Sequence, residues 1–298
     1  MEILGIKHDS ELLSPLTEDE IKALEYCELT PEEHDTEVLR QIKRIENDKV
    51  IVGTPARTQV WEDGWKENLD ELVKTHSLSA LMPRYFRKDQ PFRLFRRFIH
   101  TNNYKFDFQI RSVIQRNYFA KYLSGYSDIY EFGCGTGINL IEVSKLYPDC
   151  RLHGLDLTKS SVAIMDILHR DFGINVTGKQ FNFVTPDLNY ILGDDAAVYT
   201  VAALEQIGDQ WTNFLDYLLV QKPKIVLNLE PIFEFYDDNN LVDYCAMQFH
   251  NKRRYLSGYY TELCRLRECG KIEILEEHRT YVGNLNDESY SVVAWRPC

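Results

Sequence analysis

The sequence of 298 residues lacks several features that mark specialised classes of protein. It contains no run of eighteen apolar residues, the length needed by a membrane-spanning helix. Its first residues lack the basic and apolar segments of a secretory signal, so we expect a protein without a membrane or export role. The seven cysteines form no C-x-x-C pair, and no histidine cluster has zinc-finger spacing. This favours free thiols in the cytoplasm and no metal site.

Basic charge is also scarce, because the formal net charge is −12. A protein that binds DNA or RNA needs many lysines and arginines for phosphates, so a nucleic-acid partner is not expected. The basic residues are nevertheless concentrated: residues 84–121 contain 10 basic and 2 acidic side chains. This run is either a solvated helix face or a local site for the phosphate or carboxylate of a small substrate.

The chain divides into two parts by its residue patterns. Residues 1–127 predict an extension of helices joined by turns, with capping boxes that begin at Thr17 and Thr30. From residue 128 to 298, short runs rich in Val, Ile and Tyr alternate with helical stretches. This alternation predicts an α/β domain with a Rossmann-like, doubly wound sheet of seven strands.

Seven strands and three intervening helices are expected in the second part. The strand candidates are residues 128–132, 150–155, 182–184, 196–201, 224–229, 272–281 and 289–295, and the helices are 138–147, 158–172 and 209–221. The last two strands are joined by residues 283–287, a connection too short for a right-handed crossover. We therefore expect an antiparallel hairpin at the carboxyl end of an otherwise parallel sheet.

The most informative segment is Glu-Phe-Gly-Cys-Gly-Thr-Gly at residues 131–137, between the first strand and the first helix of the sheet. Alternate glycines let the backbone turn sharply and approach a ligand closely. The segment resembles motif I of the class I S-adenosylmethionine-dependent methyltransferases. The dinucleotide fingerprint G-x-G-x-x-G fails, because its third glycine would fall on Ile138. An acid such as Glu131 would also attract an ammonium group and repel a pyrophosphate.

Two further acids occur where this family places them. Asp156 ends the second strand, where a carboxylate accepts hydrogen bonds from ribose hydroxyls, although it could equally be a helix N-cap. The resemblance also places Asp187 at the adenine amino group, against the alternative of a turn residue after a proline. The implied S-adenosylmethionine-binding residues are Glu131, Gly133, Cys134, Gly135, Thr136, Gly137, Asp156, Leu157, Asp187, Leu188 and Ala203.

Three residues near the carboxyl ends of later strands are candidates for catalysis. A hydroxyl acceptor profits from a general base, and His250 has a suitable intrinsic pKa, although a structural role competes. Glu205 and Glu230 follow the fourth and fifth strands and could hold the acceptor, cap a helix or join His250 around a metal, for which no tight ligand spacing exists.

The basic run and a later pair of arginines are the candidates for binding a small, anionic acceptor. The residues concerned are Tyr85, Arg87, Arg93, Arg96, Arg97, Arg253 and Arg254, and the last two could instead be surface residues. Segments 61–65, 83–87 and 250–256 are similar to stretches of bacterial methyltransferases from polysaccharide and nucleotide-sugar pathways. There are two rival interpretations. The first is a protein or RNA methyltransferase, but the sequence contains no N-P-P-[YF] tetrapeptide, which is typical of methylation on amino groups. The second is a scaffold that binds the cofactor without catalysis.

Overall fold

A central sheet of seven strands organises the molecule in the computed structural model, which describes residues 17–84, 91–103 and 105–298. Across the sheet, the strands follow the order β6-β5-β4-β7-β8-β11-β9. Their bounds are Val176–Gln180 for β6, Arg151–Asp156 for β5, Asp128–Phe132 for β4, Ala196–Val201 for β7, Ile225–Glu230 for β8, Ser291–Pro297 for β11 and Ile272–His278 for β9. The first five are parallel, and β11 is antiparallel to both of its neighbours. The predicted doubly wound sheet with an antiparallel hairpin is confirmed.

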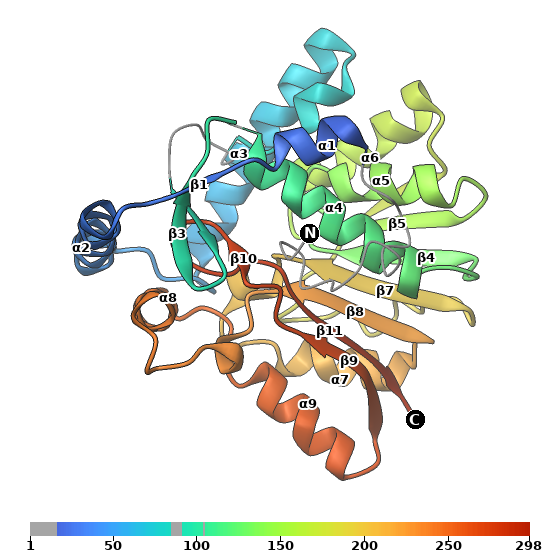
Figure 1. The fold of residues 1–298 in the computed structure, drawn as a ribbon. Helices are drawn as coiled ribbons and strands as arrows, with labels where there is room; N and C mark the ends of the chain where they lie inside the picture. Colours follow the sequence, from blue (N-terminus) through green and yellow to red (C-terminus); the bar gives the residue numbers. More distant parts are fainter. Residues whose placement is uncertain (1–16, 85–90, 104) are drawn as a thin grey trace.

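Helices cover both faces of this sheet (Figure 1). On one face lie α4 (Phe106–Tyr122), α5 (Ile138–Leu146) and α6 (Lys159–Phe172), which share one core with the sheet. On the other face lie α7 (Thr212–Gln221) and α9 (Tyr259–Glu268), which share a second core. Neighbouring residues of β4 enter different cores, because successive side chains of a strand point to opposite faces.

The third strand in the sequence differs from its prediction. We expected it at residues 182–184, but β6 spans Val176–Gln180 and the chain turns after its end. Only Val176 of β6 is buried, because the strand lies at the edge of the sheet. The polar sequence Val-Thr-Gly-Lys-Gln therefore lacks the apolar run by which a buried strand is recognised. The segment 182–184 is consequently free to contribute to a site beyond the strand's end.

The first part of the chain contains strands as well as helices. Its helices are α1 (Glu18–Ala23), α2 (Pro31–Asn47), α3 (Pro55–Thr75) and the short 3₁₀ helix η3 (Leu78–Leu81), and both predicted capping boxes are present. A small antiparallel sheet follows the order β1-β3-β2-β10. Its strands are β1 (Cys27–Glu28), β3 (Arg97–His100), β2 (Phe92–Leu94) and β10 (Val282–Gly283). The last of these comes from the β9–β11 connection, so this sheet ties both parts of the chain together.

Three elements after the central strands complete the described structure. The 3₁₀ helix η4 (Leu204–Ile207) follows β7, and η5 (Phe233–Phe235) and helix α8 (Leu241–Arg253) follow β8. Helix α8 packs against α2. Within the described residues, no helix combines the length and the apolar character that a bilayer crossing needs.

Candidate functional site

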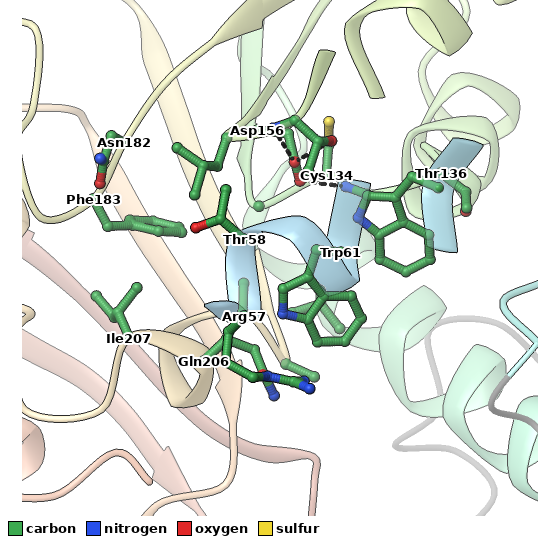
Figure 2. A pocket seen from close by; sticks show the side chains of 18 of the residues that line it. Arg57, Thr58, Trp61, Cys134, Thr136, Asp156, Asn182, Phe183, Gln206 and Ile207 are labelled. Carbon is green, nitrogen blue, oxygen red and sulfur yellow. Dashed lines mark hydrogen bonds between the residues drawn. The ribbon is translucent and has the colours of Figure 1, made fainter. Parts of the chain in front are cut away.

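A cavity of about 460 Å³ lies at the carboxyl ends of β4, β5 and β7. In open parallel sheets, ligands bind at this edge. Its walls come from the glycine loop, the end of β5, residues 182–184 and the segment that begins with η4. Helix α3 crosses the opening and contributes Arg57, Thr58, Trp61 and Trp65 (Figure 2). The first part of the chain therefore helps to enclose the cavity.

The glycine loop forms the floor of this cavity. Gly133, Gly135 and Gly137 have φ values of +78°, +51° and +74°, a region that L side chains rarely adopt. Neighbouring atoms also leave too little room for a side chain at these glycines. A Cβ on Gly133 would lie 2.4 Å from Ala203 Cβ, and a Cβ on Gly135 would lie 3.0 Å from Trp65 Cζ2. Trp65 thus packs directly on the loop, while the loop still lines the open cavity.

Asp156 fixes the loop and also lines the cavity. Its Oδ2 accepts a 2.9 Å hydrogen bond from the Gly135 amide, and its Oδ1 accepts bonds from Thr158 N and Oγ1. Burial raises the pKa of Asp156 above its ordinary value. The N-cap of α6 is Thr158 rather than Asp156, so the N-cap alternative for Asp156 is wrong. The carboxylate therefore both holds the backbone of the glycine loop and faces the cavity.

Glu131 lies behind the cavity wall. It is fully buried, its Oε1 accepts a 2.6 Å bond from Asn139 Nδ2, and its Oε2 accepts a bond from Tyr199. Burial raises the pKa of Glu131 to about 8, so the carboxyl is mostly neutral at physiological pH. Asn139, not Glu131, lines the cavity, and its buried Oδ1 has no hydrogen-bond partner among the described residues. The expected direct contact of Glu131 with a ligand is therefore corrected: Asn139, which is bonded to Glu131, lines the cavity in its place.

The remaining loop residues have structural partners. Cys134 is buried, and burial raises the pKa of its thiol well above the ordinary value. Thr136 Oγ1 donates a 2.7 Å bond to Leu81 O, which ties the segment after α3 to the loop. Both residues line the cavity together with Leu157 and Ala203.

Helix α3 is anchored at several points above the cavity. Trp61 and Trp65 stack with ring centroids 5.2 Å apart. Between them, Glu62 accepts hydrogen bonds from the first amides of α6 at Lys159 and Ser160, where the helix dipole favours a carboxylate. Arg57 donates a 3.3 Å bond to Gln206 across the cavity mouth.

The segment after β6 provides one end of the cavity. Asn182, Phe183 and Val184 line it, and Figure 2 shows the first two on the side opposite Cys134 and Thr136. The two residues predicted for this role lie elsewhere. Asp187 pairs with Lys179 at 3.4 Å on the surface, and Leu188 is 67% exposed. The prediction for Asp187 and Leu188 is corrected, because the strand ends at Gln180 and its tip precedes them.

The two predicted catalytic glutamates lie outside the cavity lining. Glu230 is fully buried and accepts hydrogen bonds from the amides of Ala203 and Leu204. Burial and the adjacent Glu230 raise the pKa of Glu205 well above its ordinary value. We assign the pair a structural role, because it holds the turn between β7 and η4 in place.

His250 is also removed from the cavity lining. It is 1% exposed on α8, among the rings of Phe233, Tyr236 and Tyr255. Its Nε2 lies 3.7 Å from Asp287 Oδ2, and burial lowers its pKa to about 4. A histidine that stays neutral in an aromatic cluster fits the structural alternative rather than the catalytic one.

The arginines predicted to bind an anionic acceptor are used by the fold. Arg93 is 1% exposed and donates to the carbonyls of Val242, Leu285 and Asn286. Arg96 pairs with Asp237 and Asp243, Arg97 with Glu28, and Arg253 with Asp48. Arg254 is exposed at the end of α8. None of these five lines the cavity, and Tyr85 and Arg87 lie outside the described residues.

Sequence reasoning missed several residues that line the cavity: Arg57, Arg111, Asn139, Asn182 and Phe183. Asn139 carried a usable signal, because it follows the glycine loop in the first turn of a helix. Arg57 carried none, because it stands alone in an acidic part of the chain. Among the described residues, no group of three or more His, Cys, Asp or Glu side chains is placed to hold a metal ion.

Comparisons with known proteins agree with this fold. No protein-family model matches the sequence, and no curated protein matches it. The structure is similar to that of the cyclase SpnF, with a TM-score of 0.52 and 13% identity over 83% of this chain and 97% of that one. A weaker similarity, with a TM-score of 0.43 and 13% identity, is to the mitomycin 7-O-methyltransferase MmcR, over 88% of this chain and 72% of that one.

Another weak similarity is to an O-methyltransferase from neocarzinostatin biosynthesis, solved in complex with S-adenosylmethionine and 2-hydroxy-5-methyl naphthoic acid. Its TM-score is 0.42 and its identity 15%, over 82% of this chain and 70% of that one. At 13% identity, the similarity to SpnF shows the fold alone, and one fold hosts many reactions. The function must therefore be argued from the cavity itself.

Proposed function

We propose that this chain binds S-adenosylmethionine in the cavity under α3 and is a methyltransferase acting on an oxygen of a small acceptor. One observation carries the proposal: the Gly135 amide and the Asp156 carboxylate, joined at 2.9 Å, both line a single cavity at the carboxyl end of the sheet. The glycine backbone lets a ligand come close, and the neighbouring carboxylate can accept hydrogen bonds from ribose hydroxyls. Together they suit a nucleoside that carries a further substituent. The cofactor supplies an activated methyl group on a sulfonium.

The cavity residues divide naturally among the parts of this ligand. Asp156 would accept hydrogen bonds from the ribose hydroxyls, and Asn182 and Phe183 would hold the adenine. Asn139 Oδ1 would accept a bond from the methionine ammonium, and Arg111, which is buried and lines the same cavity, would bind the methionine carboxylate. Asn182 replaces Asp187 at the adenine end, because an amide oxygen can accept from an amino group as a carboxylate does.

The acceptor is a small molecule rather than a protein or an RNA. A volume of about 460 Å³ lies at the low end of the range for single-ligand pockets, and the anchored helix α3 covers it. No general base is required from His250, Glu205 or Glu230, since holding acceptor and methyl in line can itself lower the barrier by roughly 7–11 kcal/mol. No feature of the cavity supports a polysaccharide or nucleotide-sugar acceptor, and we do not propose one.

One alternative is a protein that binds the cofactor without transferring its methyl group, and the similarity to SpnF shows that this fold also occurs in a protein described as a cyclase. Titration calorimetry with S-adenosylmethionine, S-adenosylhomocysteine and NAD tests the binding step, and only the first two should release heat. Mass spectrometry of S-adenosylhomocysteine formed with candidate acceptors then separates the two functions. A protein that binds both ligands and forms no product with any acceptor is the scaffold or cyclase-like alternative, and one that binds neither ligand contradicts the proposal.

A further inference from the structure

Arg57 is a cation at the cavity wall that lacks a carboxylate partner among the described residues. Its side chain is half-buried, it donates to the neutral amide oxygen of Gln206, and its Nε is buried without a hydrogen-bond partner. Asp48, a carboxylate whose charge acts on Arg57, is itself paired with Arg253 at 2.7 Å. A guanidinium stays protonated in proteins, and a partly buried cation without an anion carries a desolvation cost.

In the proposed binding mode, Asn139 and Arg111 take the charged groups of the methionine, so Arg57 is not needed for them. Gln206, its partner, lies three residues after Ala203, on the segment that follows β7. Figure 2 shows Arg57 and Gln206 together below Trp61, away from the loop residues Cys134 and Thr136. The guanidinium also lies over the Trp61 ring, at 5.2 Å from its centroid. Arg57 is thus directed at the space beside the ligand rather than at the glycine loop.

The described lining of the cavity is poor in acids and bases. Asp156 is its only carboxylate among the described residues, and that carboxylate is engaged by Gly135 and Thr158. Within the same set of residues, no histidine, lysine, glutamate or tyrosine lines the cavity. The sulfonium of the cofactor would add a further positive charge. Cationic groups would therefore outnumber anionic ones unless the acceptor itself is negative.

We propose that the acceptor is an oxyanion, a carboxylate or an acidic phenol, whose charged oxygen is the nucleophile and is held by Arg57. The inference rests on the proposed cofactor binding. A bidentate guanidinium matches the geometry of a carboxylate. Because the nucleophile arrives ionised, the absence of a lining base among the described residues is accounted for.

The step balances without a proton transfer. The acceptor oxygen forms a bond to the methyl carbon, the bond from that carbon to sulfur breaks, and its electron pair stays on sulfur. The anionic acceptor and the sulfonium cation become a neutral methyl ester or aryl ether and a neutral thioether. The transfer thus cancels the negative charge of the acceptor and the positive charge of the sulfonium, and this cancellation assists the reaction in a site of low dielectric.

The end of α3 adds to the positive potential near Arg57. Helix α3 begins at Pro55, and its N-cap Thr54 makes no side-chain cap because its hydroxyl donates to Ile51 O. Gly53, Thr54 and Pro55 all line the cavity, so the positive end of the helix dipole reaches it. An anion beside Arg57 would thus be stabilised by two separate features.

The test uses the full chain saturated with S-adenosylhomocysteine and three matched pairs of probes. The pairs are benzoate with benzamide, phenylacetate with phenylacetamide, and 4-nitrophenolate with 4-nitroanisole, each titrated by calorimetry. In the wild type, we expect the anion of at least one pair to bind roughly tenfold or more tightly than its neutral partner. Arg57→Gln should abolish that preference, and Lys66→Gln, an exposed cation on the same helix, should keep it.

Three results would overturn the inference while leaving cofactor binding intact. The first is that S-adenosylhomocysteine binds but no anion is preferred. The second is that the preference survives in Arg57→Gln. The third is that Arg57→Gln weakens S-adenosylmethionine and leaves 5′-methylthioadenosine unchanged, which would assign Arg57 to the methionine carboxylate. If the wild type binds neither S-adenosylmethionine nor S-adenosylhomocysteine, the proposed function itself fails, and the two failures are thereby distinguished.

Discussion

Asn139 Nδ2 donates a 2.6 Å hydrogen bond to Oε1 of the fully buried Glu131. This contact uses one side of the amide and leaves Oδ1, on the other side, buried at the cavity without a described partner. Glu131 therefore positions Asn139, and the sequence motif acts through a second residue. Its pKa of about 8 means that this positioning is done mostly by a neutral carboxyl.

Asn139→Ala should weaken S-adenosylmethionine by roughly tenfold to a hundredfold, because a hydrogen bond to the charged ammonium is lost. The affinity of 5′-methylthioadenosine, which lacks the amino acid portion, should change less than about threefold. Calorimetry with both ligands makes the comparison, and Asn47→Ala on the exposed end of α2 is the control. An equal loss for both ligands would mean that the substitution disturbs the whole site and that the assignment of Asn139 is wrong.

Asn182→Ala should weaken S-adenosylmethionine and adenosine alike by about five- to tenfold, as expected for one neutral hydrogen bond. Asn182→Asp keeps an acceptor oxygen and should bind nearly as well as the wild type. Asp187→Ala, on the surface beside Lys179, should have no effect on affinity. The reverse pattern, with a loss in Asp187→Ala and none in Asn182→Ala, would restore the sequence-based prediction for the adenine end.

Gly135→Ala should lower the free energy of unfolding by roughly 1–3 kcal/mol, because a non-glycine residue is strained at φ +51°. It should also weaken S-adenosylhomocysteine, since the new Cβ lies 3.0 Å from Trp65 and displaces the ring. Gly64→Ala is the matched control: nothing lies within 4 Å of its Cβ, and the helix should gain roughly 0.5–1 kcal/mol. Urea denaturation and ligand calorimetry measure both effects, and unchanged binding in Gly135→Ala would argue against a ligand at the loop.

His250 makes stability depend on pH in a defined direction. Its folded-state pKa of about 4 lies below the ordinary 6.5, so the unfolded chain takes up the proton first as pH falls. The wild type should lose about 3 kcal/mol relative to His250→Leu between pH 6.5 and pH 4, and the difference should then level off.

Urea denaturation at several pH values measures the His250 effect, with His169→Gln on the exposed face of α6 as the control. Affinity for S-adenosylmethionine at pH 7.5 should be the same in His250→Leu and in the wild type. A selective loss of acceptor turnover with intact stability would instead return His250 to a catalytic role.

Some parts of the fold could be predicted because their signal is local. Strand β4 was predicted with its observed bounds, Asp128–Phe132, because its apolar residues Ile129, Tyr130 and Phe132 directly precede the glycine loop. Strand β6 was misplaced, because only one of its five residues is buried. The small sheet was missed for a related reason: its strands have two to four residues, and β10 is contributed from nearly two hundred residues away.

The candidate site divides in the same manner. Gly133, Gly135 and Asp156 were predicted from their residue types. A backbone with positive φ favours glycine, and a carboxylate at a strand end requires an acidic residue. The acceptor residues were not. Arg93 and Arg57 are the same residue type, yet the first donates to three carbonyls and the second faces the cavity without a carboxylate partner among the described residues.

By itself, the sequence determined the alternation of strands and helices in the central sheet, the antiparallel end of that sheet and the glycine loop, because these follow from short-range periodicity and backbone conformation. Tertiary structure alone decided which charges are compensated. It placed His250, Glu205, Arg93 and Arg96 in the fold's interior or its ion pairs, and it left Arg57 and Asn139 at the cavity. The physical reason is that the free energy of a polar group depends on partners and burial supplied by distant parts of the chain.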